Sequence, residues 1–322
     1  MSFRELCDLP LLAGYVIVLA VVLGAVFGSF LNCMAWRMVH HESVLKGRSH
    51  CASCGHPLKA ADLVPVFSYL FLKGKCRYCG EKISPRYMAA ELVSAALWLG
   101  CVFRYGVSWE LLRAIAFICV LFVLSLVDLE TYTIPNRLLA AALVIYAVTF
   151  PLVEFGLPGS LSCTNLAPEE AGSFAAAALG GLTRDLGGAL LLGGGLLILS
   201  LVFDKITGKE GLGGGDIKLF FVTGLYLGAL RGLLCLIVSC LVGLAFAGFR
   251  KNRKIPFGPA ISIGIVLNLF FGDPVIRWYP GLLQRMMDAR FENSAMKILG
   301  SILKVVGFKI SSQGNSENAA SR

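Results

Sequence analysis

Charged residues are scarce in this chain. Only 15% of its 322 residues are Asp, Glu, Lys or Arg, whereas an average soluble domain carries about 25%. Hydrophobic residues make up 57% of the chain, and the mean hydropathy is +0.75. This composition excludes an ordinary soluble domain and predicts a membrane protein that crosses the bilayer several times.

Features of three other protein classes are also missing. The net charge of +9 is not accompanied by a basic motif with interleaved aromatic residues, so no nucleic-acid partner is expected. No glycine-rich nucleotide-binding fingerprint is present. The apolar run after Met1–Pro10 is too long for a cleaved signal peptide and is expected to remain as a first membrane span.

Eight apolar stretches approach the roughly 20 residues that a transmembrane helix needs. They lie near residues 11–35, 87–103, 110–127, 137–155, 187–203, 217–230, 232–249 and 258–272. We therefore predict an all-α polytopic membrane protein with about eight transmembrane helices and a small cytoplasmic zinc-binding loop module.

The orientation follows from the basic residues in the loops. Residues 37–86 hold nine Lys or Arg against three acids, and residues 250–256 hold four more. Residues 151–186 hold Arg184 alone against four acids, and the Gly-, Ala- and Ser-rich part at 156–186 is predicted to be a flexible external loop. Because positive loops stay in the cytoplasm, the basic loops are expected inside and both termini outside.

Four of the eleven cysteines form two CxxC pairs, Cys51 with Cys54 and Cys76 with Cys79. Two such pairs can present four thiolates to one tetrahedral zinc ion, which would be structural because protein ligands fill every position. One zinc per chain is therefore predicted. A redox dithiol and incidental cysteines are the alternatives, and His50 or His56 could replace a cysteine as ligand.

Two acidic residues lie where apolar segments end or begin, Asp128 in VDLETYTIPN and Asp216 in GLGGGDIKL. A carboxylate at the edge of the hydrocarbon is costly and marks either function or an ion pair. The glycines at 213–215 allow the backbone to approach a neighbour closely. Two carboxylates that share one proton can hydrolyse a peptide bond. The alternatives are interfacial acids at helix ends and a pairing of Asp216 with Lys218.

Together these motifs resemble the bacterial prepilin peptidases, also called type IV prepilin leader peptidases. The resemblance covers residues 24–272 and rests on GSFLNCMAWR, the two CxxC pairs, DLVPVFSYLFLKGKC, ISPRYMAAELVSA, DLETYTIPN and GGGDIKL. It implies an aspartic endopeptidase with Asp128 and Asp216 as the catalytic pair. It also implies Cys51, Cys54, Cys76 and Cys79 as zinc ligands, and a role of Gly74 in methyl transfer.

The resemblance further implies the substrates and the cellular location. Such enzymes cut the basic leader of type IV prepilins and pseudopilins, between a glycine and usually a phenylalanine, at the cytoplasmic face of the plasma membrane. Many also N-methylate the new N-terminus with S-adenosylmethionine. The chain departs from the family pattern at Val39, where a proline is common, in the length of 156–186, and in the tail beyond about residue 280.

Four parts of the chain are expected on these grounds. They are a first transmembrane segment at 1–36, the cytoplasmic tetracysteine module at 37–86, a transmembrane peptidase domain at 87–272, and an amphipathic and disordered tail at 273–322. Two other functional classes are the rivals. A transporter would use the acids for ion coupling and should show inverted repeats, and a membrane-anchored zinc adaptor would use 37–86 to bind a partner.

Overall fold

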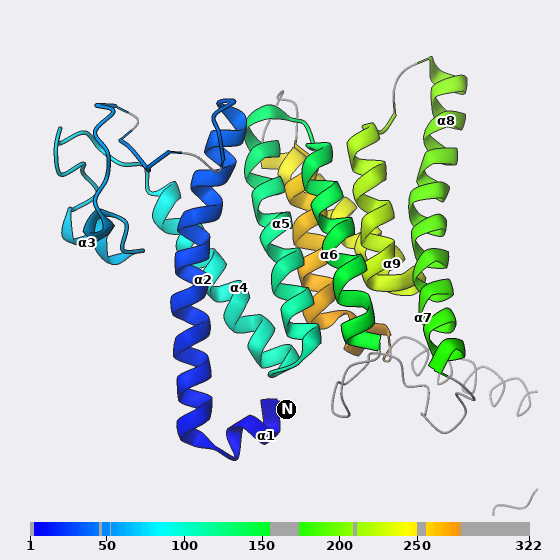
Figure 1. Ribbon diagram of the computed structural model, residues 1–322. Coiled ribbons are helices and arrows are strands. Elements are labelled where there is room, and N and C mark those ends of the chain that lie inside the picture. The colour runs from blue at the N-terminus through cyan, green and yellow to red at the C-terminus, as the bar shows by residue number, and fades with distance from the viewer. Residues whose placement is uncertain are drawn as a thin grey trace, which may run out of the picture. The chain divides into compact units, whose positions relative to one another are not determined.

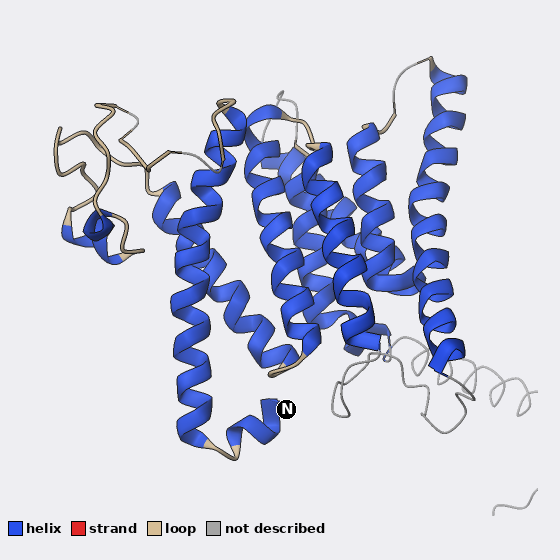
Figure 2. Ribbon diagram, viewed as in Figure 1, coloured by secondary structure: helices blue, strands red, loops and turns tan. Residues whose placement is uncertain are grey.

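The computed structural model describes residues 3–44, 47–51, 53–154, 174–208, 211–249, 256–276 and 278. Apart from two isolated β-bridges, the regular secondary structure of these residues is helical (Figures 1 and 2). The elements are α1 (Phe3–Cys7), α2 (Pro10–Val39), η1 (Ala60–Asp62), α3 (Phe67–Phe71), α4 (Arg86–Tyr105), α5 (Trp109–Thr131), α6 (Asn136–Glu154), α7 (Phe174–Ala189), the π-helical turn η3 (Leu190–Gly194), α8 (Gly195–Thr207) and α9 (Gly214–Phe249). A last helix covers Gly258–Ile276.

Among the described residues, seven helices are long and apolar enough to cross a membrane. They are α2, α4, α5, α6, Leu179–Thr207, α9 and Gly258–Ile276. Large apolar side chains on these helices face outward, among them Leu11 at 92% exposure and Ile206 at 78%. Such exposure is unfavourable in water and expected in lipid, so the prediction of an all-α polytopic membrane protein is confirmed.

The count of seven differs from the expected eight because α9 contains two of the predicted segments. Gly228, with φ 71° and ψ −177°, interrupts its helical backbone. Before Gly228, α9 runs parallel to α6, since Lys218 Nζ donates to Asn136 Oδ1 (3.1 Å) and Tyr226 Oη donates to the carbonyl of Ala142 (2.8 Å).

Beyond the interruption, α9 runs in the opposite direction. Asn268 Nδ2 donates to the carbonyl of Arg231 (2.7 Å), and Gly264 lies against Ser239, so this part is antiparallel to Gly258–Ile276. That last helix begins beside the C-terminal end of α5, where α6 starts. The chain therefore reverses at Gly228, and the predicted segments 217–230 and 232–249 lie on its two sides.

Small residues bring the helices into close contact. A Cβ atom added to Gly24 of α2 would lie 2.8 Å from Ala95 Cα of α4, and one added to Gly28 would lie 2.7 Å from Ser94 Cβ. Helix pairs in membranes depend on such packing because no hydrophobic effect drives them together. At the centre, the ring of Phe117 from α5 stacks on that of Tyr226 from α9 at 3.7 Å.

The predicted flexible loop at 156–186 is wrong from Phe174 onward, because α7 begins there. Its glycines and alanines are compatible with a packed membrane helix. The buried carboxylate of Asp185 accepts a hydrogen bond from Tyr146 Oη (2.7 Å) and pairs with Arg184 (3.0 Å). Residues 155–173 lie outside the described part.

The chain forms two compact units, Met1–Gly272 and Asp273–Arg322. The second unit, with the predicted amphipathic tail, lies outside the described residues except for 273–276 and 278. Within the first unit, α2 ends at Val39 and α4 begins at Arg86, and the cysteine-containing segment lies between them.

Candidate active site and metal centre

Asp128 lies in the last turn of α5, where the helix is ended by local features. Ser108 caps the start of α5 by accepting the N–H of Leu111 (3.2 Å). At the other end, Tyr132 adopts left-handed backbone angles (φ 54°, ψ 31°) and its N–H donates to the carbonyl of Asp128 (2.9 Å). Pro135 then separates α5 from α6. The side chain of Asp128 is therefore fixed on a rigid helix and is 3% exposed.

Asp216 lies in the first turn of α9, directly after the three glycines. Its N–H donates to the carbonyl of Gly213 (3.0 Å). A Cβ atom on Gly215 would lie 3.0 Å from Cβ of Ile134, in the connection that follows α5. The absence of a side chain at residue 215 thus lets the start of α9 approach the end of α5, as the glycine run predicts.

The two carboxyl groups lie at the same end of the helix assembly. The contact between Gly215 and Ile134 places the start of α9, which carries Asp216, beside the end of α5, which carries Asp128. The ends of α5 and the starts of α6 and α9 lie together at the top of Figure 1. The structure therefore brings together two acids separated by 88 positions of sequence.

A third element contributes to this site. The N–H of Gly258 donates to Oδ2 of Asp128 at 2.9 Å, and a Cβ atom on Gly258 would lie 2.8 Å from the same oxygen. Residue 258 opens the last described helix and precedes Pro259, and the first amides of a helix have no intrahelical partner. The contact orients the carboxylate of Asp128.

Sequence reasoning did not identify Gly258 as a site residue. A glycine followed by proline at the start of an apolar segment is typical of a helix N-terminus. That pattern could have indicated a free amide at the start of this helix, but not its partner, which is 130 residues away.

Neither neighbouring cation pairs with the two acids. Lys218, the alternative partner of Asp216, donates instead to Asn136. Arg86, at the start of α4, forms an ion pair with Glu130. Glu130 is thus engaged with the N-terminal half of the chain, which leaves Asp128 and Asp216 as the acids that can act together.

The four predicted cysteine ligands meet in one cluster. The Sγ atoms of Cys51, Cys54, Cys76 and Cys79 all lie within 4.8 Å of one another. The Sγ atoms of Cys51 and Cys79 are 3.9 Å apart, close to the separation of about 3.8 Å that a tetrahedral zinc ion with bonds of about 2.3 Å requires. The cluster fits a metal ion, and the chemistry of four thiols favours zinc.

The cluster is prepared for metal binding without the histidines. The backbone N–H of Cys54 lowers the pKa of the Cys51 thiol to about 7, so this thiolate forms readily near neutral pH. At Cys79 a backbone hydrogen bond from Glu81 lowers the pKa, but desolvation and the other three thiols outweigh it and raise that pKa to about 12. The ring of His56 stacks on Tyr78 at 3.8 Å, and His50 packs edge-on against Trp36. Neither histidine belongs to the metal-binding group found among the described residues.

Asp62 links the second CxxC turn to the start of η1. Its carboxylate accepts from Arg77 Nε (2.6 Å), Tyr78 Oη (3.0 Å) and the N–H of Lys59 (3.1 Å). Desolvation raises the pKa of Asp62, but these hydrogen bonds outweigh it and leave that pKa below its ordinary value. The stabilisation by Asp62 is therefore present at neutral pH and is lost only as the pH falls through this lowered value.

Gly74 is not a ligand of the cysteine cluster but shapes the turn before Cys76. Its φ of +67° favours glycine, and a Cβ atom there would lie 2.9 Å from Tyr69 Oη. Its carbonyl accepts from the N–H of Ile83 (2.8 Å). Any side chain at residue 74 would therefore displace Tyr69.

Comparison with known proteins gives matches over most of the chain. Residues 22–105 match the family model described as "Bacterial Peptidase A24 N-terminal domain". Residues 115–248 match the model of the type IV leader peptidase family. No solved structure is a significant match.

Several curated relatives carry the name prepilin leader peptidase/N-methyltransferase. The one from Bacillus subtilis is 33% identical over 265 residues, which cover 80% of this chain and 95% of that protein. The Aeromonas hydrophila protein is 34% identical over 244 residues, 72% of this chain and 74% of that one. The Neisseria gonorrhoeae protein is 31% identical over 283 residues, which cover 80% of this chain and 91% of that protein.

Proposed function

The chain belongs to the type IV leader peptidase family, and on this basis we propose that it removes the leader of type IV prepilins or pseudopilins and then N-methylates the new N-terminus. The names of its relatives support both activities. The observation that carries the first activity is the approach of Asp128 and Asp216 from different helices at one end of the membrane assembly.

We assign cleavage to this acid pair. Because two neighbouring carboxylates do not both ionise readily, they hold one proton between them. The ionised carboxylate takes a proton from a water molecule while the water oxygen attacks the scissile carbonyl carbon. The protonated carboxyl group donates its proton to the carbonyl oxygen. The tetrahedral adduct then collapses, the C–N bond breaks, and the leaving amine takes up a proton. The glycine-to-phenylalanine type of bond is the proposed target.

Substrate selection follows from the position of the acids at the end of the bundle. A prepilin has a basic leader before an apolar helix. The apolar helix can lie in the bilayer beside the spans while the leader stays in water next to Asp128 and Asp216. The basic composition of 37–86 and 250–256 supports a position of this end at the cytoplasmic face of the bacterial plasma membrane, because positively charged loops stay in the cytoplasm.

We assign methylation to the tetracysteine module, residues 37–86, together with the ends of α2 and α4 that flank it, and the peptidase to the rest of 87–272. When bound, S-adenosylmethionine supplies the methyl group: a C–N bond forms at the new terminus, the C–S bond breaks with its electrons on sulfur, and the amine proton passes to water. Cys51, Cys54, Cys76 and Cys79 would hold one structural zinc ion. Gly74 would act through Tyr69, which it contacts.

The proposal is tested with purified protein, a prepilin and labelled S-adenosylmethionine. We expect mass analysis of the product to show loss of the leader and, on the new terminus, one methyl group. Intact prepilin after incubation in lipid would contradict the peptidase assignment. A cleaved terminus that never gains a methyl group would contradict the methyltransferase assignment alone.

Gly258 offers a specific test of the peptidase geometry. We expect Gly258→Ala to lower the rate of leader cleavage by about 10- to 100-fold, since the added Cβ forces the Asp128 carboxylate from its position and small misplacements cost such factors. Gly214→Ala is the matched control, because its Cβ would meet nothing within 4 Å. Cleavage rates of membranes carrying each variant give the comparison, and equal rates would contradict a role of Gly258.

A further inference from the structure

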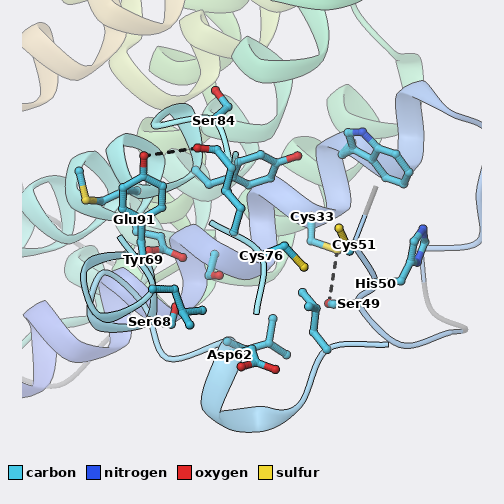
Figure 3. Close-up of a pocket in the computed structure, with 18 of the residues that line it drawn as sticks. Cys33, Ser49, His50, Cys51, Asp62, Ser68, Tyr69, Cys76, Ser84 and Glu91 are labelled. Atoms are coloured by element: carbon cyan, nitrogen blue, oxygen red, sulfur yellow. Dashed lines mark hydrogen bonds between the residues drawn. The ribbon is translucent and has the colours of Figure 1, made fainter. Parts of the chain in front are cut away.

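A cavity of about 580 Å³ lies between α2, α3, the first turns of α4 and the two CxxC turns (Figure 3). This volume is within the range of about 300–1,000 Å³ that is typical of small-molecule sites. Its wall combines apolar, aromatic and charged side chains, among them Phe30, Trp36, Tyr69, Tyr87 and Glu91. The cavity is separate from the acid pair, neither member of which lines it.

Glu91 is the notable charged group in this wall. The residue is 9% exposed, and its Oε2 accepts the N–H of Val66 at 2.7 Å. That is its one hydrogen bond within the described residues, so Oε1 is left for a ligand in the cavity. Since burying a carboxylate without a partner is costly, a cationic group is the expected occupant beside it.

The other buried or paired charges in the wall have partners from the chain. Asp62 is bonded to Arg77 and Tyr78. The buried Arg37 donates to backbone carbonyls, including those of Ser43 and Gly47. No ion pair of Glu91 exists among the residues that the structure describes. Glu91 is therefore the group that selects for positive charge.

The backbone beside Glu91 is strained in a way that supports a functional role. Val66 has φ 62° and ψ −52°, which is a rare conformation for a β-branched residue. The hydrogen bond to Glu91 holds this residue at the start of α3, and α3 carries Ser68 and Tyr69 into the cavity wall. Strain of this kind is retained where the surrounding structure fixes a binding surface.

We propose that this cavity binds the methyl donor S-adenosylmethionine, with Oε1 of Glu91 facing its positively charged methionine part. The inference rests on the methyl-transfer half of the proposed function. A nucleoside sulfonium ion combines a flat aromatic base with positive charge, and the cavity offers aromatic rings together with the buried carboxylate of Glu91, which has no cationic partner among the described residues. Aromatic faces also attract cations directly.

The position of the cavity suits transfer to a cleaved terminus. Arg86, which opens α4, pairs with Glu130, two residues beyond Asp128. Glu91 lies little more than one turn along the same helix. The cavity and the acid pair are thus connected at one end of the assembly, so a new N-terminus released at the acids stays near the donor while its apolar helix remains in the bilayer.

Glu91→Gln tests the assignment by binding, independently of turnover. Glutamine keeps an acceptor for the Val66 N–H and removes the charge. In calorimetry on the zinc-loaded full chain, we expect the affinity for S-adenosylmethionine to fall by about 10-fold or more, as for loss of a charged hydrogen bond. Glu42→Gln, an exposed change outside the cavity wall, should bind like the unaltered protein.

A second variant acts by shape rather than charge. Ser68→Trp places a large side chain in the cavity wall and should weaken donor binding at least as strongly, with zinc content unchanged. Unaltered affinity in both Glu91→Gln and Ser68→Trp would place the donor elsewhere and overturn this inference, while the proposed function would stand. An unaltered chain that cleaves prepilin but binds no S-adenosylmethionine would overturn the methyl-transfer function and this inference together.

Discussion

Asp128→Asn and Asp216→Asn are each expected to lower the rate of leader cleavage by at least about 10³-fold. Asparagine fills nearly the same space but neither takes nor gives the shared proton, and general acid–base groups contribute about 10²–10⁴-fold each. Because the two acids act as one unit, the double variant should be about as slow as either single variant. The measurement is leader removal in lipid with each purified variant.

Glu130→Gln is the matched control for this pair. Glu130 also lies at the end of α5, but it pairs with Arg86 across the surface, and exposed ion pairs contribute about 0–1 kcal/mol. We expect cleavage by this variant within a few-fold of the unaltered protein. Normal cleavage by Asp128→Asn or Asp216→Asn would remove that residue from the mechanism. Both aspartate variants should still methylate a substrate that is supplied already cleaved, since neither substitution alters the cavity or the cysteine cluster.

The sequence was most informative where local chemistry sets the structure. The paired spacing of Cys51 with Cys54 and Cys76 with Cys79 leads directly to the observed cluster, because each CxxC turn closes on itself. The cost of a carboxylate beside hydrocarbon drew attention to Asp128 and Asp216. The all-helical membrane fold and the family resemblance are confirmed on the same basis, from apolar runs and ordered motifs.

The features that sequence reasoning missed depend on contacts between distant segments. The amide of Gly258 and the carboxylate of Asp128 meet because the last helix begins beside the C-terminal end of α5. Glu91 and Val66 meet through the fold of the cysteine-containing segment, and neither position is unusual in sequence. Composition also misjudged the start of α7, since alanine and glycine are common both in loops and in packed membrane helices.

The last large effect concerns the metal. Replacing Cys51 and Cys54 together with serine is expected to reduce zinc from one ion per chain to almost none and to abolish methyl transfer. Structural zinc in small modules contributes about 10–16 kcal/mol of apparent binding energy. The described part of 40–85 has only two short helices and two isolated bridges besides the cluster, so little else can hold its fold. Metal analysis and S-adenosylmethionine binding measure the two losses.

Cleavage should respond differently, because the acid pair is held by α5, α9 and the last helix rather than by the cysteine segment. We expect the double serine variant to retain a rate of leader cleavage within about 10-fold of the unaltered protein. The ion pair of Arg86 with Glu130 connects the start of α4 to the end of α5, and such a pair contributes little free energy. Cys33→Ser, outside the cluster, should keep its zinc. Full zinc content in the double variant would refute the tetracysteine site. Zinc loss with methyl transfer intact would instead separate the metal from donor binding, and the cavity would then have to be held by α2 and α4 alone.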